Sequence, residues 1–304
     1  MLFSLIFCSY LSQLIITSES QSSVICCLFS SICTSGDGGA ICLKNPQISF
    51  TGQNCVFANC SATQNGGGIY CEPKDFGLTY CIAEHCVSFI ASFCFVLSPS
   101  TCSVLFEQVM VSYSSPDIKT VRYRSVHFDN GKQSIRFTNH TNNNADKVSG
   151  YVLLNAQSFI VSYCHFMNNY ATNWCLFDTQ TGVSTLYFTM SNYINNTMSS
   201  DRFGLIYFYC SNAEISNSFF SRSNSYLFYV YSNSLIVSNC TIHHYGNIYY
   251  GNIASSNIKI MSEISFPMHQ IEGFKIGCLD TQPTLQEMRI PKIAILVFLL
   301  NIFS

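Results

Sequence analysis

Charged residues are scarce in this sequence. They make up 10% of the 304 residues, with a formal net charge of −2, whereas a soluble domain typically carries about 25%. Without a basic excess there is no electrostatic footprint for nucleic acid or anionic membranes, so we expect no nucleic-acid partner. A compact helical protein would need charged, solvated faces. Here Ser, Asn and Thr supply the polar surface, and 18 Tyr and 25 Phe favour strands.

Motifs for nucleotide, redox and metal chemistry are also missing. The stretches 36-GDGGA-40 and 65-NGGGI-69 fit neither G-x-G-x-x-G nor the G-K-[ST] of a phosphate-binding loop. C-x-x-C is absent, Asp37 alone offers too few oxygens for Ca²⁺, and His243-His244 lacks zinc-site spacing, so we interpret it as a solvent-facing turn. We therefore expect no catalytic residue, no cofactor and no metal. The glycines read instead as turns of a repeat motif: Gly38, Gly39, Gly67 and Gly68.

Cysteine is abundant, with 17 residues of which twelve lie at or before Cys102. Reducing compartments rarely accumulate so many without a metal or redox role. Removing Cys8 with a leader would leave an even sixteen. The alternative is that many are small buried apolar residues. Cys26 and Cys27 cannot both point inward from one strand, so one should face outward or sit at a bend.

The two ends are apolar. Residues 1–20 resemble a signal peptide, although no Lys or Arg precedes the apolar run, which could instead form a first buried strand. Residues 271–290 are polar, and the 291–304 tail contains the apolar run 293–303. That run is too short to cross a bilayer as a helix and reads as a weak or truncated membrane anchor, or as a cap. The uncharged stretch between Glu84 and Glu107 is broken by Pro99, so we expect strands there.

Imperfect repeats are the most informative feature. Phe29 and Phe57 recur at an offset of 28, and Cys42 aligns with Cys71 after a one-residue slip. In the second half the anchors are spaced 27, 27 and 22: Phe166, Tyr193, Phe220 and Ile242. Two or three short strands every 22–29 residues predict an all-β, right-handed parallel β-helix over 21–270, irregular around 103–150, with 139–146 as a loop.

Stacking neighbouring coils about 4.8 Å apart would place like residues over one another. Phe29 should then lie over Phe57. The Asn pairs 168–169 and 195–196 should form amide ladders. Cys55 with Cys81, and Cys60 with Cys86, should be neighbours in adjacent coils, either bridged or simply packed.

The tetrads Gly38–Ile41 (GGAI) and Gly67–Tyr70 (GGIY), with F-x-x-N at Phe166–Asn169, resemble the repeats of the polymorphic outer-membrane protein (Pmp) family of chlamydiae. Asn- and Cys-rich repeat proteins of parasitic protists are similar. The resemblance covers 25–86 well and 158–250 loosely. It implies a right-handed β-helix displayed at a cell surface, with a role in adhesion. The chain lacks that family's C-terminal barrel segment.

The function expected from these features is that of a non-enzymatic, secreted or cell-surface β-helix, an adhesin-like scaffold for an unknown host or cell-surface protein or glycan. One alternative is a polysaccharide-cleaving β-helix enzyme, which would need clustered carboxylates on one face. Another is a truncated, non-functional member of a repeat family. Four sequons offer glycosylation sites, of which the first seems best placed, in the expected loop: Asn139, Asn59, Asn195 and Asn239.

Overall fold

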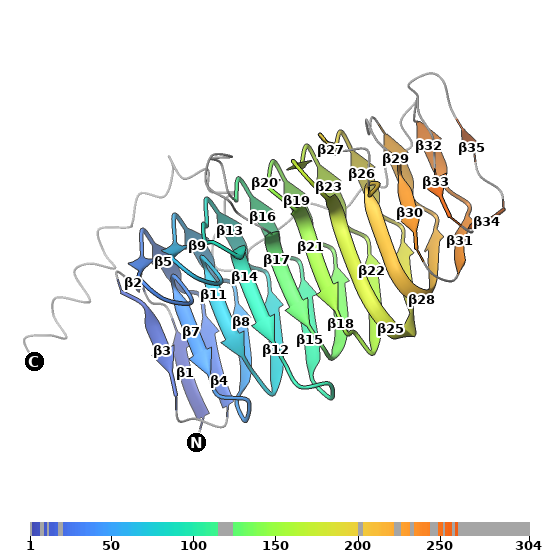
Figure 1. Ribbon diagram of the computed structural model, residues 1–304. Helices are drawn as coiled ribbons and strands as arrows, with labels where there is room; N and C mark the ends of the chain where they lie inside the picture. Colours follow the sequence, from blue (N-terminus) through green and yellow to red (C-terminus); the bar gives the residue numbers. More distant parts are fainter. Residues whose placement is uncertain are drawn as a thin grey trace, which may run out of the picture.

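The fold is a parallel β-helix. The computed structural model describes residues 2–6, 9–10, 12–17, 21–114, 124–199, 203–221, 226–231, 234–243, 249–251, 253–256 and 259–260. Every strand pairing among them is parallel, and Figure 1 shows the strands stacked coil upon coil along one axis. The predicted fold class is confirmed.

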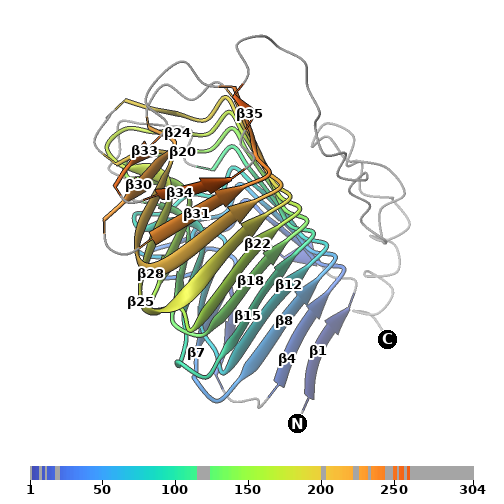
Figure 2. The same ribbon diagram turned by 90° about the vertical axis from the view of Figure 1, so that its right-hand side faces the viewer.

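Three long sheets run the length of the solenoid, and the view in Figure 2 shows the first of them as a row of parallel arrows. Each strand of sheet I pairs with its counterpart in the next coil. Its strands are β1 (Leu2–Ile6), β4 (Gln21–Ile25), β8 (Ser49–Gln53), β12 (Asp75–Thr79), β15 (Ser103–Glu107), β18 (Lys132–Arg136), β22 (Ser158–Ser162), the end of β25 (Cys175–Thr189), the end of β28 (Ile206–Ser216), β31 (Ser234–Ser238) and β34 (Ile253–Ser256).

Sheet II precedes sheet I within each coil, and two of its strands run on into sheet I. Its strands are β3 (Leu14–Ile16), β7 (Ile41–Lys44), β11 (Ile69–Glu72), β14 (Ala91–Leu97), β17 (Arg124–Asp129), β21 (Val148–Leu154), the beginnings of β25 and β28, β30 (Phe228–Val230) and β33 (Tyr249–Tyr250).

Sheet III has eleven short strands and follows sheet I in each coil. They are β2 (Ser9–Tyr10), β5 (Leu28–Ser30), β9 (Val56–Ala58), β13 (Ile82–Glu84), β16 (Met110–Ser112), β19 (Asn139–Thr141), β23 (His165–Met167), β26 (Asn192–Ile194), β29 (Phe219–Ser221), β32 (Thr241–His243) and β35 (Lys259–Ile260). Five two-residue strands complete the coils: β6 (Cys33–Thr34), β10 (Ser61–Ala62), β20 (Asn144–Ala145), β24 (Tyr170–Ala171) and β27 (Thr197–Met198).

The coil length matches the expected 22–29 residues except at the two ends. Register partners Gln21 and Ser49 are 28 residues apart, and Asn212 and Ser234 are 22 apart. The first described coil is shorter, with Leu2 paired 19 residues away at Gln21, and the last pairs Leu235 with Ile253, 18 away. Strands β1, β2 and β3 lie inside the segment 1–20, and whether that segment is cleaved stays a prediction.

Residues 103–150, expected to be irregular, contain strands β15 to β20 and most of β21, all paired with their neighbours. The irregularity takes the form of register shifts in sheet II, between Arg124 and Val126 and between Val148 and Tyr151. The prediction of a loop over 139–146 is wrong, since β19 and β20 lie there. The expected strands between Glu84 and Glu107 are confirmed as β14 and β15.

Each coil turns two sharp corners through residues in the left-handed region. The first corner lies between sheets I and III, and its residues have φ near +50°: Cys26, Asn54, Tyr80, Gln108, Phe137, Tyr163, Met190, Asn217 and Asn239. The second follows sheet III: Ser31, Asn59, His85, Tyr113, Asn142, Asn168 and Asn195. Asparagine tolerates this conformation better than most residues, which explains much of the asparagine content.

The residue after each corner points inward and forms a ladder of small side chains. The first-corner ladder is fully buried: Cys27, Cys55, Cys81, Val109, Thr138, Cys164, Ser191, Ser218 and Cys240. Its thiols and hydroxyls donate to carbonyls at the corner, as Cys164 does to Ser162 at 3.2 Å and Ser191 does to Thr189 at 2.9 Å. Most of these cysteines therefore occupy the position that Ser and Thr hold in other coils.

The second-corner ladder is equally buried: Ile32, Cys60, Cys86, Ser114, Asn143, Asn169 and Asn196. The Asn169 amide donates to Asn196 Oδ1 at 2.9 Å, and Asn143 donates to Asn169 Oδ1 at 3.0 Å. The expected amide ladder is thus confirmed for the second Asn of each pair. The first Asn, at 168 and 195, forms the corner instead.

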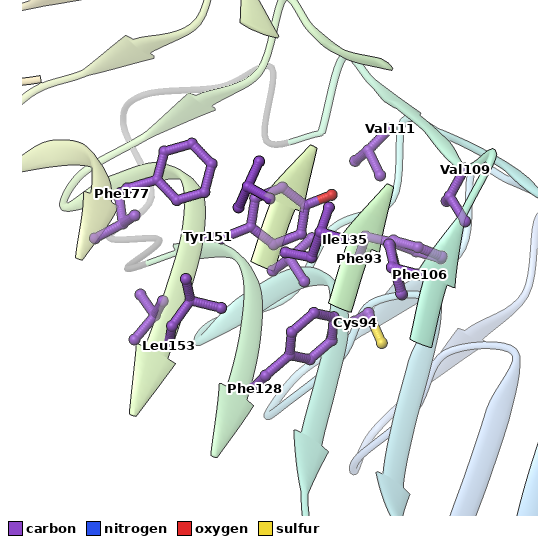
Figure 3. Close-up of a cluster of buried hydrophobic side chains, with 14 of the residues drawn as sticks. Phe93, Cys94, Phe106, Val109, Val111, Phe128, Ile135, Tyr151, Leu153 and Phe177 are labelled. Atoms are coloured by element: carbon purple, nitrogen blue, oxygen red, sulfur yellow. The ribbon is translucent and has the colours of Figure 1, made fainter. Parts of the chain in front are cut away.

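Aromatic side chains fill the rest of the interior. Phe29 stacks on Phe57 with ring centroids 5.1 Å apart, as expected. The predicted anchors pair in the same way: Phe166 with Tyr193, Tyr193 with Phe220 and Phe220 with Ile242. Figure 3 shows the middle of this core, where sheet II supplies the rings of Phe93, Phe128, Tyr151 and Phe177.

Candidate functional site

The outer face of sheet II carries the most unusual set of side chains in the described part of the chain. Strand alternation points every second residue outward. Register pairing then aligns one outward residue per coil into a row that runs from polar to aromatic: Phe95, His127, Val152, Asp178, Tyr207, Tyr229 and Tyr250. We describe its polar half and its aromatic half in turn.

The polar half gathers around β17 and β25. The Arg124 guanidinium lies 2.6 Å from His127 Nδ1, and the His127 ring stacks on Phe95 with centroids 4.5 Å apart. Burial lowers the pKa of His127 to about 3, and the charge of Arg124 lowers it further in the same direction. His127 is therefore neutral at physiological pH and can accept a hydrogen bond from Arg124.

Asp178 lies two coils from His127, and only 4% of its surface is exposed. Burial raises the pKa of this carboxyl to about 6, although the Gln180 amide, which donates to it at 2.9 and 3.0 Å, opposes the shift, as do the positive charges of Arg124 and Lys147. An outward-facing carboxyl that titrates near neutrality can change its charge under physiological conditions.

We expect Asp178→Asn to stabilise the protein at pH 7 by about 1–2 kcal/mol. The folded-state pKa of Asp178 lies above its ordinary value of 3.8, so the folded state holds the proton more tightly. Its contribution to stability is full below about pH 4 and is lost as the pH rises through 6. Denaturant titrations at pH 4 and pH 7 should show the gain at pH 7 alone. An equal gain at both pH values would mean that charge burial is not the cause.

The aromatic half, which we call the tyrosine face, covers the outer side of the last coils. It comprises Trp174, Phe203, Tyr207, Tyr209, Tyr226, Tyr229, Tyr231 and Tyr250. Trp174, the single tryptophan of the chain, stacks on Phe203 at 4.1 Å, and both rings meet the Tyr207 ring edge-on. Tyr229 stacks on Tyr250 at 4.7 Å, and a second row is formed by Tyr209 and Tyr231 at 5.2 Å. These contacts make the face one continuous surface.

Much of this aromatic surface is open to solvent. Tyr231 is 61% exposed, Tyr250 55% and Tyr209 48%. None of the eight side chains is charged. Single exposed apolar residues are ordinary on a protein surface, whereas a contiguous aromatic group marks an interaction site. The face can therefore pack against a ligand through ring faces while its phenol hydroxyls form hydrogen bonds.

Sequence reasoning missed this face. The signal was present, because 206-IYFYC-210 and 228-FYVY-231 place tyrosine at every second position. In a strand such alternation puts all of these tyrosines on one side. Recognising that side as the outer one requires knowing that Phe208 and Val230 point into the core, where both are buried.

The four predicted glycine turns lie where two coils touch, but their alignment differs by one residue from the sequence alignment. Ile41 pairs with Ile69, so Gly38 corresponds to Gly66, and both have positive φ. Cys42 accordingly pairs with Tyr70, and the alignment of Cys42 with Cys71 is wrong. Gly39 and Gly67 are close-approach positions, since the Gly39 amide donates to Gly66 at 3.0 Å and a Cβ on Gly39 would collide with the Gly67 carbonyl.

Gly67→Ala should lower the free energy of unfolding by about 2–3 kcal/mol, because backbone cannot yield as a side chain can. An added Cβ would lie 2.5 Å from the backbone of Val87 and closer still to the Ser92 carbonyl oxygen. Gly77→Ala is the matched control, since its Cβ would meet only Thr51 Cγ2 at 3.7 Å. Thermal denaturation of both variants measures the difference. Equal losses would contradict the close approach.

The four sequon asparagines occupy different environments. Asn59 and Asn239 are exposed corner residues, and Asn195 is a half-buried corner residue. Asn139 begins strand β19 and is half-buried, so the expectation that favoured it as a loop residue rested on a wrong assignment. Glycosylation at all four stays a prediction, and the exposed corners Asn59 and Asn239 now offer the more accessible amides.

Other expected features fall as follows. His243 is buried in β32 at 4% exposure, so its interpretation as a solvent-facing turn residue is wrong, and His244 lies outside the described residues. Cys26 sits at a bend and is disulfide-bonded, and Cys27 is buried, as the doublet required. Asp37 forms an ion pair with Lys44 at 2.7 Å.

Within the described residues, no three His, Cys, Asp or Glu side chains are grouped as metal ligands. The same residues include no helix long and apolar enough to span a membrane. The segments 271–290 and 291–304, with the apolar run 293–303, lie outside them. Comparison with protein-family models, curated proteins and solved structures finds no match for this chain.

Proposed function

We propose that this protein is a non-enzymatic, secreted or cell-surface β-helix that binds a neutral glycan chain along the tyrosine face, as an adhesin-like scaffold. The observation that carries the proposal is the contiguous set of eight aromatic side chains on the outer side of sheet II. Its location outside the cell is supported by the apolar, uncharged start of the sequence and by sequons at exposed corners.

The chemistry of the face favours a sugar over a charged partner. Tyrosine and tryptophan bring large, rigid contact areas at low cost in conformational entropy, and their electron-rich ring faces attract the C–H groups of a sugar ring. The phenol hydroxyls can bond sugar hydroxyls, and the eight side chains offer no charge to complement an ionic ligand. The rows advance by one coil, about 4.8 Å, which is close to the length of one sugar residue in an extended chain.

Binding to an array of neutral oligosaccharides tests the proposal. We expect Tyr231→Ala and Tyr250→Ala to weaken binding at least about tenfold, the loss expected from removing one hot-spot ring. Tyr187→Ala is the matched control, since Tyr187 is 44% exposed but lies on the outer side of sheet I. Absence of binding to any neutral glycan, or an equal loss in the Tyr187 variant, would reject the proposal. Binding to a protein alone would identify a protein partner instead.

One observation favours an enzymatic alternative, namely the raised pKa of Asp178, which suits a general acid. Glycoside hydrolysis needs a second carboxyl group about 5–9.5 Å away. The other carboxylates on the described strands of sheet II are Glu72 and Asp129. Asp129 is two coils and two residues from Asp178, or about 12 Å between Cα positions. Release of reducing ends from a bound glycan, abolished by Asp178→Asn, would establish the alternative.

A further inference from the structure

Two groups of buried cysteines stack in register between neighbouring coils. Cys60 and Cys86 are successive members of the second-corner ladder. Cys27, Cys55 and Cys81 are successive members of the first-corner ladder. All five are at most 2% exposed, and none of them is disulfide-bonded in the structure. No metal group or catalytic arrangement in the described residues uses them.

Backbone hydrogen bonds fix the separation of Cys60 and Cys86. The Asn59 amide donates to Glu84 at 3.0 Å on one side, and the Val87 amide donates to Cys60 at 2.9 Å on the other. Coils joined in this way lie about 4.8 Å apart, within the Cα separation of about 4.4–6.8 Å that a disulfide allows. The two thiols interact directly, so no backbone movement is needed to join them.

Another pair of buried cysteines provides a contrast within the same chain. Cys71 and Cys94 also lie in neighbouring coils, but Cys71 pairs with Val96 and Cys94 pairs with Ile69. They are therefore offset by two residues along the strand as well as by one coil. That offset places their Cα atoms about 8 Å apart, beyond the reach of a disulfide.

We propose that Cys60 and Cys86 form an inter-coil disulfide when the chain folds in an oxidising environment, and that one neighbouring pair among Cys27, Cys55 and Cys81 does the same. The oxidant is a small-molecule disulfide such as oxidised glutathione. One deprotonated cysteine attacks it and releases one glutathione thiol, and the second cysteine then displaces the other. Two protein thiols become one disulfide, and the oxidant becomes two thiols.

Little has to be given up for this bond. Cys60 donates to the carbonyls of Phe29 and Ala58 at 3.6 and 3.5 Å, and Cys86 donates to Phe57 at 3.6 Å, all long contacts to sulfur. The disulfide would close a loop between residues 60 and 86 and so restrict the unfolded chain, raising the thermal midpoint by several degrees. That it forms in the cell rests on the proposed secretion, whereas its geometry does not.

The test is to refold the full chain in a glutathione redox buffer, alkylate free thiols under denaturing conditions, and map the peptides by mass spectrometry. We expect a Cys60–Cys86 cross-link while Cys71 and Cys94 in the same sample carry the alkyl label. Cys86→Ser, which places at this position the residue that Ser114 already supplies in the next coil, should lose the cross-link and leave Cys60 labelled. Fully labelled Cys60 and Cys86, or a Cys71–Cys94 link, would overturn the inference.

The same samples separate this inference from the proposed function. Oxidised and reduced protein should bind the oligosaccharide array equally, because the cysteines lie far along the chain from the tyrosine face. If the cross-link is absent and binding persists, only the disulfide inference fails. If the cross-link forms and no glycan binds, only the proposed function fails.

Discussion

Acidification from pH 7 to pH 5 should destabilise the protein by about 4 kcal/mol through two buried histidines, partly offset by Asp178. Burial lowers the pKa of both His127 and His140 from 6.5 to about 3. Their folded-state pKa lies below the unfolded value, so the unfolded chain binds more protons. The stabilisation is therefore complete above about pH 6.5 and is lost as the pH falls toward 3.

His140 is the clearer of the two, because it lies in the core. Its ring packs against Tyr151 at 5.1 Å, and its Nδ1 lies 2.9 Å from the Asn143 amide. Denaturant midpoints measured between pH 7 and pH 5 should fall steeply in the wild type and less steeply in His140→Gln. His85→Gln is the control, since His85 is a half-exposed corner residue. If the pH dependence is the same in His140→Gln as in the wild type, buried histidine is not its cause.

Asn169→Ala should lower the free energy of unfolding by about 3–5 kcal/mol. The Asn169 amide donates to the His140 carbonyl at 2.8 Å and to Asn196 Oδ1 at 2.9 Å. Its oxygen accepts both the side-chain and the backbone N–H of Asn143, each at 3.0 Å. Alanine would leave polar groups in three coils without partners in a dry interior, where each costs about 1–3 kcal/mol.

The neighbouring residue supplies the control for this variant. Asn168 is exposed and forms the second corner with φ of 56°. Asn168→Gly keeps the backbone hydrogen bond to Ile194 and suits the left-handed conformation, so we expect a change within about 1 kcal/mol. Equilibrium denaturation of both variants measures the contrast. A loss in Asn169→Ala no larger than in Asn168→Gly would show that the ladder contributes little.

The coil period could be predicted where aromatic anchors repeat, because each coil offers the same interior space to its equivalent residue. The period faded in the middle because the anchor position changes identity there. Phe57 is followed in this ladder by Ala83, Val111 and His140 before Phe166. The missing volume comes from sheet II, where Phe93 contacts Phe57 and Tyr151 contacts His140.

The ladders after the corners could not be recognised from residue identity alone. Cys164, Ser191, Ser218 and Cys240 occupy one column of the sequence repeats, yet sulfur and oxygen look unrelated there. Their shared role, a small buried donor to a corner carbonyl, is visible only once the corner is formed. The cysteine content, which suggested disulfides or plain packing, thus has a third physical explanation.

That this solenoid works outside the cell is tested most directly by mass spectrometry of the protein from its native source. The expected result is a mature chain that begins near residue 18–22 and carries a glycan at Asn59 or Asn239. Such a chain would start its first coil at strand β4, which begins at Gln21. An intact Met1 together with unmodified asparagines at all four sequons would contradict secretion, and with it the proposal of a surface ligand.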